Sequence, residues 1–200
     1  MRKDKSIQPL PFAVYYYTVV LLALVGLAVS LYLSYSHFRV YTDIGYKSFC
    51  AISKSINCDT VSESSYSIFW RLPVPVWGIV GYTFFLLFLL IAKNRNAHNK
   101  RIWNVLFLIA AAFTLYCVIL AAISTFYIRS YCIMCIVLYA VNLLLLFYTR
   151  MIRSRFKSGG LIEGLKKDIQ FLQSRRSSVL RIFTPFLVGV ILLLIFFPSY

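Results

Sequence analysis

The sequence contains very little acidic charge. Asp and Glu together account for 6 of its 200 residues, and all charged residues for 14%. So few carboxylates leave little room for acid–base catalysis by a carboxylate pair. Internal repeats, phosphate-binding loops and nucleophile elbows are also absent. The only two histidines, His37 and His98, fall in different segments and do not suggest a shared metal site.

Apolar residues dominate what remains. The chain is 60% hydrophobic with a mean hydropathy of +0.78, whereas ordinary soluble domains are nearer ~45 to 50% apolar. We therefore expect an integral membrane protein. Runs of about 20 apolar residues can cross a bilayer, and five fit: residues 12–33, 74–92, 102–128, 131–148 and 182–197. The fifth is the weakest, because it is short and carries Pro185 in its predicted first turn.

The net charge of +15 is distributed unevenly along the chain. Of the 21 Lys and Arg residues, 16 lie before the first span, in residues 93–101 or in residues 150–181. The positive-inside rule places these segments, and with them the N-terminus, in the cytoplasm. The charge thus indicates topology, and we do not expect nucleic-acid binding. The first run is too long for the ~7 to 15 residues of a signal-peptide core, so we expect it to remain as a span.

Four of the five cysteines are predicted to gather at the external membrane face. Cys50 and Cys58 lie in the loop of residues 34–73, which is polar enough to move, and Cys132 and Cys135 begin the fourth span. A helix start favours thiolates, and residues three apart on a helix can form a disulfide. The external face is also where an oxidising compartment is expected. The two pairs can therefore exchange disulfides.

Other interpretations of these cysteines remain open. Cys50 and Cys58 can form a permanent staple in an exported loop. A zinc site of four thiolates is disfavoured, because Cys50 and Cys58 are too far apart in sequence for a short knuckle. Cys117 lies in the middle of the third span, where a cysteine is expected to pack as a small hydrophobic residue.

Several motifs follow one another in a specific order. Cys50 is followed by Cys58-Asp59-Thr60-Val61, and Ser64 stands six residues past Cys58; Leu72-Pro73 and Gly78 enter the second span; Cys132-Ile133-Met134-Cys135 precedes Tyr139 by four residues. From about residue 12 to 150 this pattern resembles the vitamin K epoxide reductase family, specifically its bacterial quinone-linked disulfide-forming members. Another membrane disulfide oxidase that uses quinone has its Cys-x-x-Cys before the widely spaced pair, so its order is reversed.

The resemblance implies an all-α integral membrane protein in which the first four spans enclose a quinone near the external face. Cys50 would exchange with a thioredoxin-like protein, Cys58 would pass electrons to Cys132, and Cys135 would face the quinone. The quinone would be ubiquinone or menaquinone, in the inner membrane of a bacterium. Ser64 and Tyr139 match positions near the quinone head in relatives.

The chain departs from many bacterial relatives in two places. Trp70 and Arg71 stand where those proteins often have a Gly beside an apolar residue, which leaves the loop geometry before Pro73 open. Many relatives also carry a thioredoxin-like domain after the fifth span, whereas this sequence stops at Tyr200. We therefore expect the thioredoxin-fold partner to be a separate protein outside the cytoplasm.

The predicted organisation has three parts: a catalytic four-helix domain in residues 1–150, a basic cytoplasmic linker in residues 151–177, and a fifth transmembrane helix in residues 178–200. Within the linker, Leu161, Leu165, Ile169 and Leu172 fall on one helical face, which is typical of a helix on the membrane surface. We see no catalytic residue in this helix.

An apolar bundle can supply a cavity for an isoprenoid quinone. The aromatic residues available to line it are Trp77, Tyr82, Phe84, Phe85 and Phe113, but for each of them contact with lipid or packing between helices is the favoured alternative, because the chain is rich in aromatic residues.

The leading hypothesis is a membrane thiol–disulfide oxidoreductase that oxidises a thioredoxin-like dithiol and reduces a quinone, which supports disulfide formation. The sequence does not fix the direction of this reaction. The alternative is a non-enzymatic scaffold or transporter subunit whose external loop is held by a structural disulfide.

Overall fold

The protein is a bundle of long apolar helices. A computed structural model describes residues 11–92, 102–155 and 160–197, and within them five helices are long and apolar enough to cross a membrane. In chain order the elements are α1 (Phe12–Thr42), α2 (Cys58–Glu63), η1 (Ser65–Ser67), β1 (Ile68–Phe69), β2 (Leu72–Pro73), α3 (Val74–Ala92), α4 (Trp103–Ile123), η2 (Ser124–Ile128), α5 (Ile133–Arg155), α6 (Leu161–Ser174) and α7 (Arg176–Phe196). The expectation of an all-α membrane protein is confirmed.

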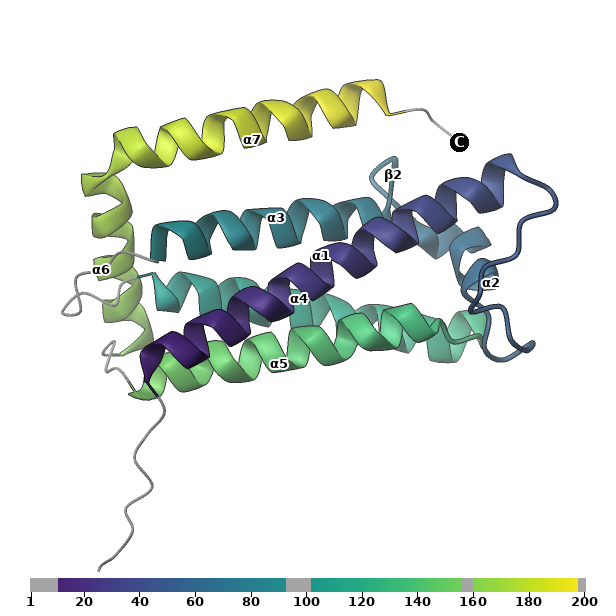
Figure 1. The fold of residues 1–200 in the computed structure, drawn as a ribbon, viewed down its shortest axis with the longest axis horizontal. Coiled ribbons are helices and arrows are strands. Elements are labelled where there is room, and N and C mark those ends of the chain that lie inside the picture. Colours follow the sequence, from purple (N-terminus) through teal and green to yellow (C-terminus); the bar gives the residue numbers. More distant parts are fainter. Residues whose placement is uncertain (1–10, 93–101, 156–159, 198–200) are drawn as a thin grey trace, which may run out of the picture.

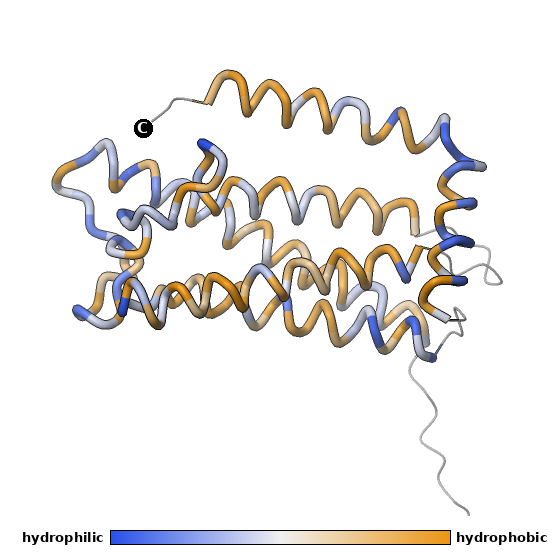
Figure 2. The backbone as a smooth tube through the Cα atoms, turned by 180° about the vertical axis from the view of Figure 1, so that it is seen from behind, coloured by the Kyte–Doolittle hydropathy of each residue, from blue (hydrophilic) through white to orange (hydrophobic). Residues whose placement is uncertain are grey.

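The arrangement separates two ends of the bundle. Helices α1, α3, α4 and α5 run side by side, α2 lies at one end and α6 crosses the other (Figure 1). Apolar residues cover the long helices, and hydrophilic residues concentrate near the two ends (Figure 2). This pattern suits a bundle that crosses a bilayer. The predicted cytoplasmic segments 1–10 and 93–101, the latter with His98, lie outside the described residues.

Helices α1, α5 and α7 are longer than their predicted apolar runs. Helix α1 continues past residue 33 to Thr42, and its last turns bury Ser36 and His37. Helix α7 begins at Arg176, so Pro185 lies in its interior and the prediction that this proline occupies the first turn was wrong. Proline inside a transmembrane helix is tolerated where neighbouring groups satisfy the freed carbonyl.

Helices α1 and α3 approach each other closely through glycine. A Cβ at Gly26 of α1 would overlap the ring of Tyr82, and a Cβ at Gly78 of α3 would lie 2.6 Å from the Ser30 hydroxyl. At each glycine, a side chain of the neighbouring helix therefore packs directly against the helix backbone. Helix association in lipid depends on this kind of close packing, because lipid tails are as apolar as the helix surfaces.

Helix α7 packs on the outside of α3 by aromatic contact. The ring of Phe84 lies 5.4 Å from that of Phe183 and 5.8 Å from that of Phe186, and Phe88 lies 4.9 Å from Phe183. The large apolar residues farther along α7, such as Leu187 and Ile191, are exposed. In a membrane this face would contact lipid.

Helix α6 is held to the bundle by a buried carboxylate. Asp168 Oδ2 accepts hydrogen bonds from the backbone N–H of Asn104 at 3.0 Å and from its Nδ2 at 3.2 Å. A carboxylate at the start of α4 satisfies an unpaired backbone donor and complements the helix dipole. Asp168 and Gly164 are buried while Ile169, in the predicted apolar stripe, is 52% exposed, so contact of that stripe with the membrane surface stays a prediction.

The α1–α3 contact gives a stability prediction. We expect Gly26→Ala to destabilise the protein by about 2 kcal/mol, because the added methyl forces the Tyr82 ring out of a tightly packed site. Gly189→Ala in α7 is the matched control, since a Cβ there meets nothing within 4 Å. Thermal unfolding of both variants in detergent measures the difference. Equal melting temperatures for the two variants would contradict this account of the packing.

Candidate active site

A short backbone bridge positions the two cysteine pairs. Ile56, in the loop after α1, pairs in parallel with Tyr131, just before α5. The bridge consists of Asn57 N–H donating to the Tyr131 carbonyl at 3.0 Å and Tyr131 N–H donating to the Ser55 carbonyl at 2.9 Å. Since Cys58 and Cys132 follow this bridge directly in their segments, it brings two residues 74 positions apart to the same point.

Cys50 and Cys58 form a disulfide, with their Cα atoms 5.6 Å apart. The Asn57 side chain accepts hydrogen bonds from the N–H groups of Asp59 and Thr60 and so caps α2, which begins at Cys58. Asp59 Oδ2 in turn accepts from Ser48 N–H at 3.1 Å. Both sulfur-bearing residues are buried. The predicted mobile loop is thus anchored around its cysteines.

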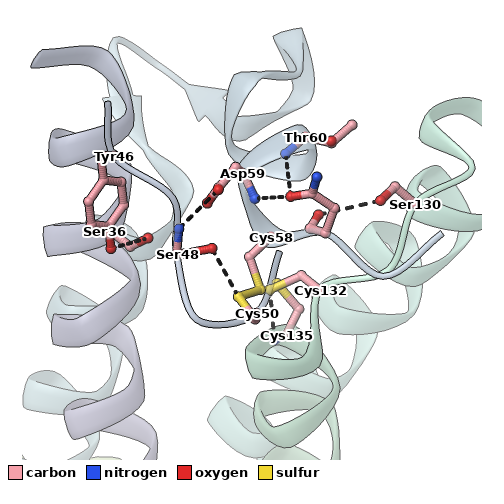
Figure 3. Close-up of a disulfide and its surroundings, with 11 residues drawn as sticks. Ser36, Tyr46, Ser48, Cys50, Cys58, Asp59, Thr60, Ser130, Cys132 and Cys135 are labelled. Carbon is pink, nitrogen blue, oxygen red and sulfur yellow. Dashed lines mark hydrogen bonds between the residues drawn. A yellow bond between two sulfur atoms is a disulfide. The ribbon is translucent and has the colours of Figure 1, made fainter. Parts of the chain in front are cut away.

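Cys132 lies against this disulfide. Cys50, Cys58 and Cys132 belong to one buried cluster with Leu33, and Cys135 packs on it; Figure 3 shows Cys132 between the disulfide and Cys135. Cys132 and Cys135 are both free thiols. We refer to Cys50 and Cys58, which the structure pairs as a disulfide, as the outer pair, and to Cys132 and Cys135, which it leaves as thiols, as the inner pair.

The start of α5 activates Cys132. Its sulfur accepts a hydrogen bond from the Cys135 backbone N–H at 3.2 Å, as an N-cap side chain does. A hydrogen bond from the Cys135 side chain is the main cause that lowers the pKa of Cys132, and the N–H groups of Cys135 and Met134 add to it. Burial and the charge of Asp59 act in the opposite direction. Cys132 is thus the thiol of the pair suited to exist as a thiolate.

An apolar cavity of about 480 Å³ opens beneath these sulfurs. Its wall includes Cys58, Cys132 and Cys135 but not Cys50. None of the described residues that line it is Asp, Glu, Lys or Arg. A mostly apolar cavity with a few polar groups is typical of a site for a small organic ligand.

The structure brings most predicted ligand-binding residues to this cavity. Ser64 and Tyr139 both line it, and the Ser64 hydroxyl donates to the Val61 carbonyl at 2.7 Å. Among the predicted aromatic residues, Trp77, Tyr82 and Phe113 line the cavity. The other two aromatic candidates take the alternative of interhelical packing: Phe84 packs against α7, and Phe85 is fully buried in the core among the helices.

His37 and Asn142 line the cavity although they were not predicted to do so, and so does Cys117, which was expected only to pack. His37, on the last turns of α1, lines the cavity near Cys58 and its ring lies 4.9 Å from that of Tyr41. Asn142 lines the far end, where its Nδ2 donates to Cys117 Sγ at 2.9 Å. Cys117 therefore does more than fill apolar space. A polar amide within an apolar span was the one sequence signal that pointed to Asn142.

The described residues do not form a cluster of side chains that could bind a metal ion. Across residues 11–92, 102–155 and 160–197, no three His, Cys, Asp or Glu side chains are arranged to hold an ion.

The comparison with known families decides the classification. A model of the vitamin K epoxide reductase family matches residues 17–150, from within α1 to within α5. The chain belongs to this family. The match covers every element that contributes to the cysteine cluster and the cavity. Membership implies, in general terms, membrane chemistry that links disulfides to quinones. A search of curated proteins returned no significant match.

The hydrogen bonds at Cys132 predict how its reactivity depends on pH. Because the thiolate is the reactive form, a lowered pKa makes alkylation of Cys132 reach half its maximal rate at a lower pH than for an ordinary cysteine. Cys135→Ala removes the side-chain donor, so we expect the midpoint to move to higher pH. Cys135→Ser keeps an O–H donor and should stay closer to the parent protein.

Site-resolved mass spectrometry of iodoacetamide labelling across a pH series measures these midpoints. The same midpoint in the Ala and Ser variants would show that the Cys135 side chain does not control the Cys132 thiol.

Proposed function

We propose that the protein is a membrane thiol–disulfide oxidoreductase that takes electrons from a thioredoxin-like dithiol and delivers them to ubiquinone or menaquinone. Electrons enter at Cys50 and Cys58, pass to Cys132 and Cys135, and leave from Cys135. The site lies at the external face of a bacterial inner membrane, and the reaction supports disulfide formation outside the cytoplasm.

The single observation that carries this proposal is the order of the sulfurs relative to the cavity. Cys50 lies away from the cavity, whereas Cys58, Cys132 and Cys135 line it. A permanent structural disulfide would require neither two free thiols beside it nor a thiol activated at a helix start. The arrangement therefore favours the enzyme over a scaffold or transporter subunit with a stapled loop.

The chemistry consists of exchange steps that balance. A partner dithiol reduces the Cys50–Cys58 disulfide and becomes a disulfide itself. The Cys58 thiolate then attacks Cys132 of an oxidised inner pair, and Cys50 resolves the mixed disulfide, which leaves Cys132 and Cys135 as thiols. These two thiols give two electrons and two protons to the quinone. The products are the Cys132–Cys135 disulfide and a hydroquinone.

Access to the outer pair requires a local opening. Cys50 has no exposed surface, so a soluble partner cannot attack it in the conformation described. The contacts that hold the segment around it include the bridge at Tyr131, the Asp59 bond to Ser48 and the packing of Phe49 on Tyr32. Opening would break such contacts locally and leave the helix bundle folded. We expect that docking of the partner protein triggers this opening.

Turnover tests the overall reaction. Purified protein in detergent, supplied with a reduced thioredoxin-fold protein and a soluble ubiquinone or menaquinone analogue, is expected to reduce the quinone, as followed by its ultraviolet absorbance. Cys135→Ala should lower the rate by at least about 100-fold, since it removes the thiol that faces the quinone. Gly189→Ala, in the lipid-facing helix, is the control that should keep the parental rate. Equal rates in Cys135→Ala and the parent would reject the proposal.

Disulfide trapping tests the order of the sulfurs. With Cys50 and Cys135 both replaced by Ala, Cys58 and Cys132 should form a stable disulfide under mild oxidation, because the bridge between Ile56 and Tyr131 sets these two residues beside each other. The matched control replaces Cys58 and Cys135, which leaves Cys50 and Cys132. Non-reducing peptide mass spectrometry should find the crosslink mainly in the first variant. A crosslink of equal yield in the control would contradict transfer through Cys58.

A further inference from the structure

A polar cluster lies at the far end of the cavity from the sulfurs. It joins three helices: Tyr82 of α3 donates from its hydroxyl to Asn142 Oδ1 of α5 at 3.0 Å, and Asn142 Nδ2 donates to Cys117 Sγ of α4 at 2.9 Å. All three side chains line the cavity. Polar groups in the middle of an apolar bundle are costly to bury, and such groups commonly mark functional sites.

The cluster holds the Asn142 amide at both ends. Its oxygen accepts from the Tyr82 hydroxyl and its nitrogen donates to Cys117 Sγ, so the amide is held between α3 and α4. Tyr82 is itself held, because its ring occupies the space left by Gly26. The amide nitrogen carries two N–H groups, and the contacts among the described residues use one of them. The other remains a fixed donor at the cavity wall.

The spacing along α5 places this donor on the same helical face as the reacting sulfur of Cys135. Cys135, Tyr139 and Asn142 are spaced i, i+4 and i+7, so they share one helical face, and all three line the cavity. Two turns separate the Cα atoms of Cys135 and Asn142 by about 10 Å, and both side chains lean toward the N-terminus, so the sulfur and the amide stay a similar distance apart. A para-quinone has one carbonyl oxygen at each end of its ring. A ring lying along this face can therefore meet the sulfur at one end and the amide at the other.

We propose that Asn142 binds the quinone carbonyl remote from Cys135, and that Tyr82 and Cys117 are positioning residues that hold its amide. The inference rests on the proposed quinone reduction and deepens it, because it assigns the substrate as a quinone with carbonyls at opposite ends of the ring. As two electrons enter the ring, negative charge develops on the far oxygen. A preoriented N–H donor in an apolar cavity stabilises that charge. The protons released by Cys132 and Cys135 complete the hydroquinone.

Steady-state kinetics test the role of Asn142. Asn142→Leu keeps the approximate volume but removes the donor, so we expect the KM for the quinone analogue to rise about tenfold, the size of one lost hydrogen bond. The KM for the thioredoxin-fold partner should not change. Cys117→Val removes the acceptor that orients the amide, and its effect should exceed that of Cys117→Ser, which keeps an acceptor. An unchanged quinone KM in Asn142→Leu would overturn the inference.

Thiol protection gives a readout that does not depend on turnover. The reduced protein is labelled with N-ethylmaleimide in the presence of increasing duroquinol, whose ring carbons are all substituted and which cannot oxidise thiols. Peptide mass spectrometry reports each cysteine separately. We expect Cys135 and Cys117 to be protected with the same midpoint concentration, and Asn142→Leu to raise both midpoints about tenfold.

The outcomes separate the two levels of the proposal. Protection of Cys135 without Cys117 would mean that the ring does not reach the cluster, which overturns the role of Asn142 and leaves quinone reduction intact. Protection of neither thiol would overturn the cavity as the quinone site, and the role of Asn142 with it.

Discussion

The parallel bridge between Ile56 and Tyr131 is the constraint on which the site depends. Two backbone hydrogen bonds fix the register between a loop and a helix start that are remote in sequence. A different register would shift Cys58 along the start of α5 and separate it from Cys132. The Ser130 hydroxyl supports the bridge from one side by donating to the Asn57 carbonyl at 3.4 Å, and the Ser130 carbonyl accepts from Ser124 at 2.5 Å. The sulfurs are thus positioned by backbone pairing rather than by their own chemistry.

Below the sulfurs, the helices leave a space that is apolar along its length and polar at its two ends. Close packing of α1 on α3 through Gly26 and Gly78 fixes one wall, while α4 and α5 form the opposite wall. Thiols occupy one end and the Asn142 cluster the other. Such a distribution excludes strongly hydrated ligands, because nothing along the walls replaces their water. The proposed quinone, a flat ring with a hydrogen-bond acceptor at each end, fits this distribution.

The sequence was a good guide to whatever depends on local composition. Apolar runs predicted the five spans, and alternating positive charge with the cysteine positions placed four thiols at one end of the bundle, where the structure has them. Local composition could not predict whether a given side chain points into the cavity, toward a neighbouring helix or toward lipid. Phe84 and Phe85 are adjacent to cavity residues in sequence, yet helix rotation turns them toward α7 and the core. Asn142 and the bridge at Tyr131 were missed because both depend on pairing between distant segments.

The segment before Pro73 illustrates a second limit. Trp70 and Arg71, which depart from the glycine often found in relatives, have φ angles of 50° and 68° and form the tight turn between β1 and β2. A two-residue hairpin turn with positive φ at both positions normally selects Gly or Asn. Here the turn forms with bulky residues, and the Trp77 indole N–H, which donates to the Phe69 carbonyl at 2.9 Å, ties the hairpin to α3. Tertiary contact has overridden the local preference.

The direction of the proposed reaction is set at the two ends of the electron path rather than within the sulfur cluster. Exchange between two neighbouring dithiols is reversible, so the sulfur cluster alone does not favour either direction. Net electron transfer in one direction requires that electrons leave irreversibly at one end. Release of the hydroquinone from the cavity into the lipid provides this irreversible step. At the other end, burial of Cys50 restricts exchange to a partner that can open the loop. A buried disulfide at the entrance and an apolar exit would therefore couple one dithiol partner to the quinone pool. Small external thiols would not reach the buried disulfide and so could not reduce it in place of the partner.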